Sequence, residues 1–223
     1  LSAALRARKR AQKPPQGPSP RPQWPHRLYP YRPLQRNAFP LGNRRYDTGA
    51  LAAELRDASG VWQSKSKGGG WSSLTIRSSQ ASDSPHLAAR TPGAETYAYT
   101  SLAQQLPRVR AVLDSLGTGV LLVRYLKLEP GELVKFHTDE MVFSNTSKIV
   151  RLHLPVVTND RAVLRFGTPL REPSKGYLVW EAKQEWEVHM PAGRVWFTNV
   201  NALHSVYNGG QAARIHLVID VQP

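Results

Sequence analysis

The chain has 223 residues with 40% hydrophobic content, which is enough to build a core and excludes wholesale disorder. No segment approaches the roughly 18 uninterrupted apolar residues of a membrane-spanning helix, so no membrane span is expected. There is no cysteine, which excludes disulfide scaffolds, thiolate metal sites and thiol nucleophiles. Any metal must therefore be bound through nitrogen and oxygen.

The net charge of +14 is concentrated at the N-terminus. Residues 1–46 contain eleven of the thirty Lys and Arg and no acidic residue, and residues 1–40 contain nine of the eighteen prolines. Because proline fixes its backbone and lacks an amide donor, this composition predicts a basic, poorly ordered tail over 1–46 and a domain over 47–223. A solvated tail or a gene-start artefact is the preferred interpretation. An organelle transit peptide and an arm for nucleic acid or another anionic surface stay open.

The first part of the domain is predicted to be helical. A short helix is expected to begin at Asp47 or the next residue, because a polar cap precedes Leu51 and Leu55 at i and i+4. Residues 101–116 also read as a helix, which Pro107 either kinks or divides into two parts.

From residue 119 onward, apolar and polar residues alternate with a period of two, between turns rich in Gly, Pro and Asn. Eight or nine short strands without an intervening helix favour an antiparallel sandwich or barrel. The predicted fold class is therefore mainly β, a double-stranded β-helix (a cupin-like jelly roll) with an N-terminal α-helical region. The predicted strands are 74–77, 120–128, 134–137, 149–157, 162–166, 177–180, 185–189, 194–199, 204–207 and 213–221.

One short motif offers metal ligands. If residues 136–139 are extended, His137 and Asp139 point to the same side, because side chains alternate along a strand. An imidazole and a carboxylate so placed supply two adjacent ligands, and a second histidine from a distant strand would complete a two-His, one-carboxylate face suited to non-haem Fe(II). His-x-Asp alone is a weak signal. Histidines 153, 189, 204 and 216 lie in the β region and are the candidates for the third position.

Two arginines occupy unusual strand positions. Arg151 and Arg214 each lie on the strand face opposite a row of aliphatic residues. An arginine that points into a barrel is costly unless it meets an anion, whereas one that points outward simply faces water. The alternation is compatible with both arrangements.

Taken together, these segments resemble the aspartyl/asparaginyl β-hydroxylase family of Fe(II)- and 2-oxoglutarate-dependent dioxygenases, some bacterial members of which hydroxylate free proline. The resemblance covers roughly residues 47–221 and is most specific from residue 120. The matching motifs are LKLEPG at 126–131, HTD at 137–139, RLH at 151–153, WFTN at 196–199, HSVYN at 204–208 and RIHLV at 214–218.

The resemblance implies a role for each matching residue. His137, Asp139 and His204 would bind the metal and form the catalytic centre. Arg151, His153 and Arg214 would bind the cosubstrate. The animal enzymes lack the acid that Asp139 matches, so its presence places the chain nearer the bacterial hydroxylases. It also favours hydroxylation over halogenation, since a halide needs the position that a carboxylate occupies.

The expected activity is hydroxylation of an amino acid, or of an amino-acid residue in a peptide or protein, with Fe(II), 2-oxoglutarate and O₂, giving succinate and CO₂ as coproducts. Trp71, Arg77 and Trp196 are candidate substrate contacts, since indole walls and a guanidinium suit an amino-acid-like substrate. Core tryptophans and a surface arginine explain them equally well.

Two other functions compete with this expectation. One is a metal cupin that isomerises or cleaves a small molecule without a cosubstrate. The other is a non-catalytic binding module recruited to nucleic acid by residues 1–46. On the enzyme interpretation no nucleic-acid partner is expected, and the location is cytoplasmic unless the basic N-terminus directs organelle import.

Overall fold

The computed structural model describes residues 37–64, 70–79, 81, 97–117, 119–139, 149–169 and 182–222. Within these residues the chain forms two antiparallel sheets, two α-helices and one short 3-10 helix. This is the predicted mainly β double-stranded β-helix with an N-terminal helical region. The predicted strand 177–180 and residues 1–36 of the predicted tail lie outside the described residues.

The larger sheet has the strand order β1-β10-β7-β12-β5-β3-β2, and β4 pairs with β3. It combines segments from both ends of the described chain, because β12 near the C-terminus lies between β7 and β5. Its strands are β1 (Ala38–Pro40), β2 (Gln63–Ser64), β3 (Ser72–Ser79), β4 (Tyr97–Tyr99), β5 (Val120–Leu128), β7 (Val150–Val157), β10 (Trp196–Thr198) and β12 (Arg214–Val221).

The smaller sheet has the order β6-β11-β8-β9. Its strands are β6 (Leu133–His137), β8 (Ala162–Pro169), β9 (Ala182–His189) and β11 (His204–Asn208). Between the sheets, Leu164, Phe166 and Met190 form an apolar cluster, against which Trp186 and Trp196 pack.

The helices begin where local chemistry satisfies their free amides. Helix α1 (Thr48–Asp57) is capped by Asp47, whose carboxylate accepts a 2.9 Å hydrogen bond from the amide of Ala50. The second predicted helix is divided into a 3-10 helix (Ser101–Gln105) and α2 (Pro107–Leu116). Pro107 starts α2 because the first position of a helix needs no amide donor. Each α-helix has ten residues, and no described helix is long and apolar enough to cross a bilayer.

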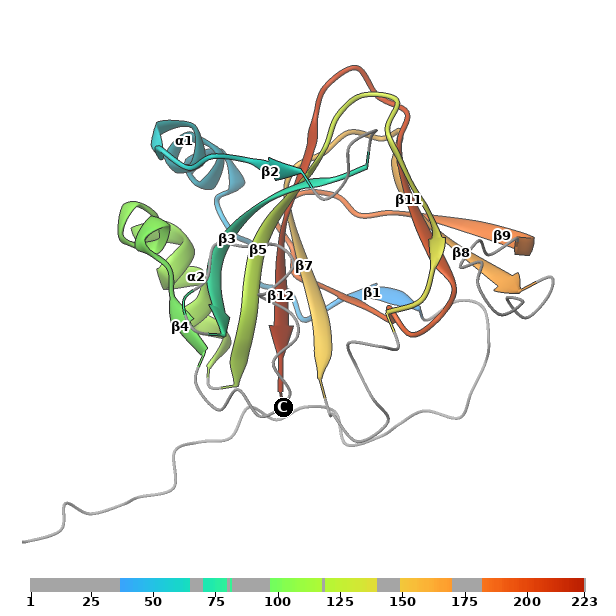
Figure 1. Ribbon diagram of the computed structural model, residues 1–223. Helices are drawn as coiled ribbons and strands as arrows, with labels where there is room; N and C mark the ends of the chain where they lie inside the picture. Colours follow the sequence, from blue (N-terminus) through green and yellow to red (C-terminus); the bar gives the residue numbers. More distant parts are fainter. Residues whose placement is uncertain are drawn as a thin grey trace, which may run out of the picture. The chain divides into compact units, whose positions relative to one another are not determined.

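Helices α1 and α2 lie on one side of the larger sheet, whereas β8, β9 and β11 lie on its other side (Figure 1). The helix-facing side carries the aliphatic rows of β7 and β12, of which Leu152, Leu154 and Leu217 are fully buried. Because alternate side chains point to opposite faces of a strand, Arg151 and Arg214 point toward the smaller sheet. Both guanidinium groups are therefore inside the molecule, and the outward arrangement that the alternation also allowed does not occur.

The chain first pairs with the larger sheet before residue 47. Strand β1 pairs with β10, and the amide of Tyr46 donates a 2.8 Å hydrogen bond to the carbonyl of Gly193. Pro40 is tolerated in β1 because this strand lies at the edge of the sheet. The bounds 1–46 and 47–223 stay a prediction, and β1 shows that part of the basic segment contacts the sheet. A three-residue edge strand carries too little alternation to be recognised in the sequence.

Candidate active site

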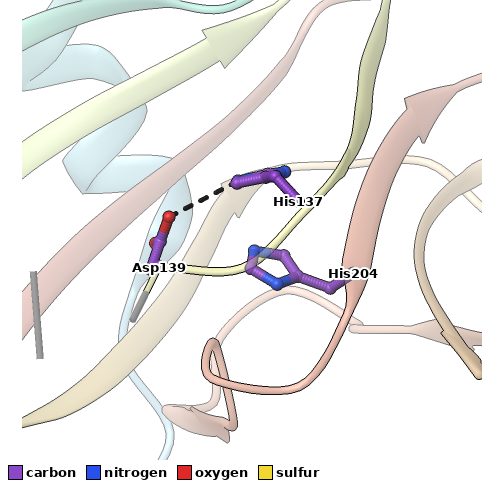
Figure 2. A group of neighbouring side chains, drawn as sticks. All are labelled: His137, Asp139 and His204. Atoms are coloured by element: carbon purple, nitrogen blue, oxygen red, sulfur yellow. Dashed lines mark ion pairs between the residues drawn. The ribbon is translucent and has the colours of Figure 1, made fainter. Parts of the chain in front are cut away.

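Two histidines face one another at the ends of two neighbouring strands of the smaller sheet. Strand β6 ends at His137, β11 begins at His204, and the two residues are register partners. Their ring centroids are 4.3 Å apart. Two residues after β6, the amide of Asp139 donates a 2.9 Å hydrogen bond to Val200, which turns its carboxylate back toward the histidines. Figure 2 shows the three side chains converging.

Hydrogen bonds to the backbone set the tautomer of both imidazoles. Nδ1 of His137 lies 2.8 Å from the carbonyl oxygen of Lys135, and Nδ1 of His204 lies 2.8 Å from that of Ala202. A carbonyl only accepts, so each Nδ1 carries the proton and each Nε2 keeps its lone pair. Metal-ligating histidines are held in this way by a second hydrogen bond.

The protonation states also suit a metal. Burial, reinforced by the neighbouring His137, lowers the pKa of His204 to about 4, so its imidazole is neutral at pH 7. Burial raises the pKa of Asp139, but the charge of Arg151 and the other cations outweigh this and hold the pKa below its ordinary value. Neutral imidazoles and an ionised carboxylate are the forms that bind metal ions.

The spacing of the donor atoms fits a single ion. One donor atom from each of the three residues lies within 4.8 Å of the others, and His137 Nε2 is 3.5 Å from Asp139 Oδ1. With metal–ligand bonds of about 2.1 Å, adjacent donors are roughly 3 Å apart and opposite donors about 4.2 Å, so small movements suffice. Two imidazoles and one carboxylate form the set typical of non-haem Fe(II) with open positions.

A buried ion-pair chain supports the carboxylate. Arg151 donates to both oxygens of Asp220, at 2.7 Å from Nε and 2.9 Å from Nη2, and its Nη1 contacts the second oxygen of Asp139. Burial lowers the pKa of Arg151, but Asp220 and Asp139 raise it by more, so the guanidinium stays charged. These ion pairs join Asp220 and Arg151 of the larger sheet to Asp139, which follows β6 of the smaller sheet, and they orient the Asp139 carboxylate.

The sequence interpretation missed Asp220. Its signal was the alternation in the last strand, where Asp220 lies on the same face as Arg214 and His216, six and four residues after them. The acid was overlooked because nothing in the sequence shows that it lies opposite Arg151 on β7.

The second arginine lies in a different setting. Arg214 is 5% exposed and forms a 2.8 Å hydrogen bond to His216, whose Nδ1 is also 3.4 Å from that of His153. Burial lowers the pKa of Arg214 to about 9, and burial together with Arg214 holds the pKa of both histidines well below the ordinary value. No carboxylate pairs with Arg214 within the part of the chain that the structure describes.

The three predicted substrate contacts lie in three different surroundings. Trp196 is the register partner of His153 and packs on the apolar cluster between the sheets. Trp71 lies under the guanidinium of Arg124, 5.4 Å from ring centroid to Cζ. Arg77 is not brought to the metal ligands, since its guanidinium lies over Tyr99, as does that of an arginine of α2.

An antiparallel double-stranded β-helix with a two-His, one-carboxylate face is the arrangement typical of non-haem Fe(II) oxygenases. Beside it lies a buried arginine for which the described residues provide no counter-ion. The Aspartyl/Asparaginyl beta-hydroxylase family matches residues 49–223. The chain belongs to this family. It is accordingly a hydroxylase that uses Fe(II), 2-oxoglutarate and O₂.

One solved structure has a similar fold, and two others match more weakly. A 2OG-Fe(II) oxygenase family oxidoreductase from Burkholderia pseudomallei matches with a TM-score of 0.54 and 12% identity, over 84% of this chain and 86% of that chain. The epimerase SnoN from nogalamycin biosynthesis gives 0.48 and 15%, over 79% and 75%. A Pseudomonas putida prolyl-4-hydroxylase gives 0.44 and 17%, over 83% and 92%. Among curated proteins, no sequence matched.

Proposed function

We propose that this chain hydroxylates an amino acid, or an amino-acid residue of a peptide or protein, at a centre formed by His137, Asp139 and His204. The observation that carries the proposal is the convergence of these three side chains with both Nε2 lone pairs directed inward by backbone hydrogen bonds. A bound Fe(II) would supply O₂ activation coupled to the oxidative decarboxylation of 2-oxoglutarate.

Each protein group has a definite task in this proposal. His137 and His204 donate nitrogen lone pairs, and Asp139 contributes one oxygen while Arg151 holds the other. This leaves one face of the ion open for the cosubstrate and O₂. The anionic Asp139 also reduces the positive charge at the centre.

Arg214 is proposed to bind the far carboxylate of 2-oxoglutarate. A guanidinium fork matches a carboxylate in two parallel hydrogen bonds, which are strong where water is excluded. His216 directs the arginine through its 2.8 Å hydrogen bond. The buried cation is thereby given the counter-charge that no described residue provides.

Contacts of Arg151 and His153 with the cosubstrate remain part of the proposal. His153 supports it by its position, because it shares with Arg214 a hydrogen-bonded contact to His216 inside the sheet. Arg151 already engages Asp139 and Asp220, so its first task in this chain is to hold the carboxylate ligand.

The proposed substrate class rests on family membership, since the family is that of the aspartyl and asparaginyl β-hydroxylases. Trp196 is proposed as a wall of the substrate space because it lies in the same row of the sheet as His153, on the face that points inward. Its indole Nε1 is buried without a described acceptor, which leaves it able to bind a substrate oxygen.

The test is succinate formation from 2-oxoglutarate after anaerobic loading with Fe(II) and admission of O₂. Wild-type protein is expected to form succinate, and His137→Ala to lose at least about 100-fold of the rate, since one of three metal ligands is missing. Equal rates in the two proteins would refute the proposal. Turnover that does not depend on added 2-oxoglutarate would instead indicate a metal cupin without a cosubstrate.

A further inference from the structure

A third arginine, Arg124, is buried on the inward face of the larger sheet. It has no role in the metal and cosubstrate sites described above. Arg124 lies on β5 as the register partner of Val218 on β12, and Val218 is in turn the partner of His153 on β7. It therefore occupies the row of the larger sheet that also carries His153 and Trp196. Only 7% of Arg124 is exposed.

Arg124 is a buried cation for which the described residues provide no counter-ion. Its guanidinium rests on the indole of Trp71, and its Nε has no hydrogen-bond acceptor among the described residues. Neither a carboxylate nor a carbonyl of the described chain pairs with it. A buried unpaired charge is costly, so its retention calls for an anion that the described residues do not provide.

The neighbouring charges are already matched. Asp220 offsets Arg151 with two hydrogen bonds. On the proposed function, on which this inference rests, Asp139 and the chelating carboxylate of 2-oxoglutarate offset the two charges of Fe(II), and Arg214 offsets the other carboxylate. After these pairings, the positive charge of Arg124 has no matching negative charge among the described residues and the proposed ligands.

Arg124 and Arg214 have separate backbone positions in the larger sheet. Arg214 pairs with Leu128, four residues along β5 from Arg124, which is about 13 Å of strand. Burial lowers the pKa of Arg124 to about 10, and the charges of Arg151, Asp220 and Asp139 also act on it. For Arg214 burial alone acts. Arg124 is therefore electrostatically part of the metal end of the site.

We propose that Arg124, supported by the indole of Trp71, binds a carboxylate of the substrate beside the metal centre. The planar fork binds a carboxylate through two hydrogen bonds, and stacking on the indole fixes its plane. Within the proposed substrate class, the enzyme thus selects a free amino acid or an aspartyl residue, which carry a carboxylate near the carbon that is hydroxylated. An asparaginyl residue is disfavoured, because its uncharged amide leaves the buried cation unpaired.

The probes are the common amino acids and N-acetylated tripeptides, each as a carboxylate and as the matching amide. They are added to the Fe(II)- and 2-oxoglutarate-loaded enzyme, and stimulated succinate formation is measured. We expect at least one carboxylate to stimulate turnover with a kcat/KM about 30-fold or more above that of its amide, the discrimination typical of an unpaired buried charge. Arg124→Met should abolish this preference, and Arg124→Lys should retain part of it because the charge remains without the fork.

Three further measurements separate the possible outcomes. The dissociation constant of 2-oxoglutarate should change less than about twofold in Arg124→Met, because Arg214 holds the cosubstrate. The matched control is Arg165→Met, since Arg165 also lies over an aromatic ring, that of Tyr207, but is partly exposed and paired with Glu187. It should behave as wild type. Circular dichroism of each variant checks the fold.

Several results would overturn the proposal. One such result is wild-type succinate formation that responds equally to carboxylates and amides, or to no carboxylate at all. Another is an unchanged preference for carboxylates in Arg124→Met. A third is a large rise in the dissociation constant of 2-oxoglutarate in Arg124→Met, which would make Arg124 a cosubstrate residue. Failure of the proposed function looks different, because wild-type protein would then form no succinate from 2-oxoglutarate with any probe.

Discussion

Replacement of Asp220 by Asn tests the buried ion-pair chain directly. The side chains of Arg151 and Asp220 are 9% and 5% exposed and are joined by hydrogen bonds of 2.7 and 2.9 Å. Breaking a buried pair by neutralising one partner destabilises by about 3–5 kcal/mol. Asn keeps the shape and one acceptor, so we expect a loss near the lower limit, about 3 kcal/mol in the free energy of unfolding.

A second consequence concerns the metal. Arg151 holds one oxygen of Asp139, and Asp220 holds Arg151, so the substitution loosens the carboxylate ligand without removing it. Groups that orient a metal ligand typically change metal affinity 10–100-fold. We expect the dissociation constant of Fe(II) to rise about tenfold in Asp220→Asn, whereas a purely structural role would leave it unchanged.

The assay is urea unfolding of wild type, Asp220→Asn, Arg151→Met and the double variant, with anaerobic Fe(II) titration of each. In the double variant the two effects should not add, because removing Arg151 also removes the charge that the first substitution leaves unpaired. Asp160→Asn, at an exposed position, is the control and should stay within about 0.5 kcal/mol of wild type. Additive losses, or a change of less than about 0.5 kcal/mol in Asp220→Asn, would refute the reasoning.

Two further predictions follow from the same interior. Arg214→Met should raise the KM for 2-oxoglutarate about 30-fold or more with a smaller effect on kcat, because one carboxylate loses its charged partner; an unchanged KM in steady-state succinate assays would place the cosubstrate elsewhere. Without added metal, the free energy of unfolding should fall as the pH is lowered from 6.5, because the folded-state pKa values of His153, His204 and His216 are lowered and the unfolded chain therefore takes up these protons first. Each histidine contributes up to about 1.4 kcal/mol per pH unit. Urea unfolding at pH 7, 6 and 5 measures how steeply the free energy of unfolding changes with pH. This dependence should be weaker in His216→Gln. An unchanged pH dependence in that variant would contradict the role given to His216.

Much of the fold follows from local patterns. The Asp47 cap and the division at Pro107 correspond to α1 and α2, and the period of two after residue 119 corresponds to the strands from β5 onward. These patterns are short-range, so neighbouring residues suffice to encode them. Strand β1 was missed because its place is decided by pairing with β10, about 160 residues away along the chain.

The sequence alone determined which residue types were available and which face of each strand they shared: His137 with Asp139, and Arg151 and Arg214 each opposite an aliphatic row. Only the tertiary structure decided which face points inward, because that depends on where α1 and α2 cover the larger sheet (Figure 1). Once the helices bury the aliphatic rows, the arginines must enter the space between the sheets. Strand pairing then brings Asp220 to Arg151, whereas it places no described carboxylate beside Arg124. Alternation within one strand contains neither result.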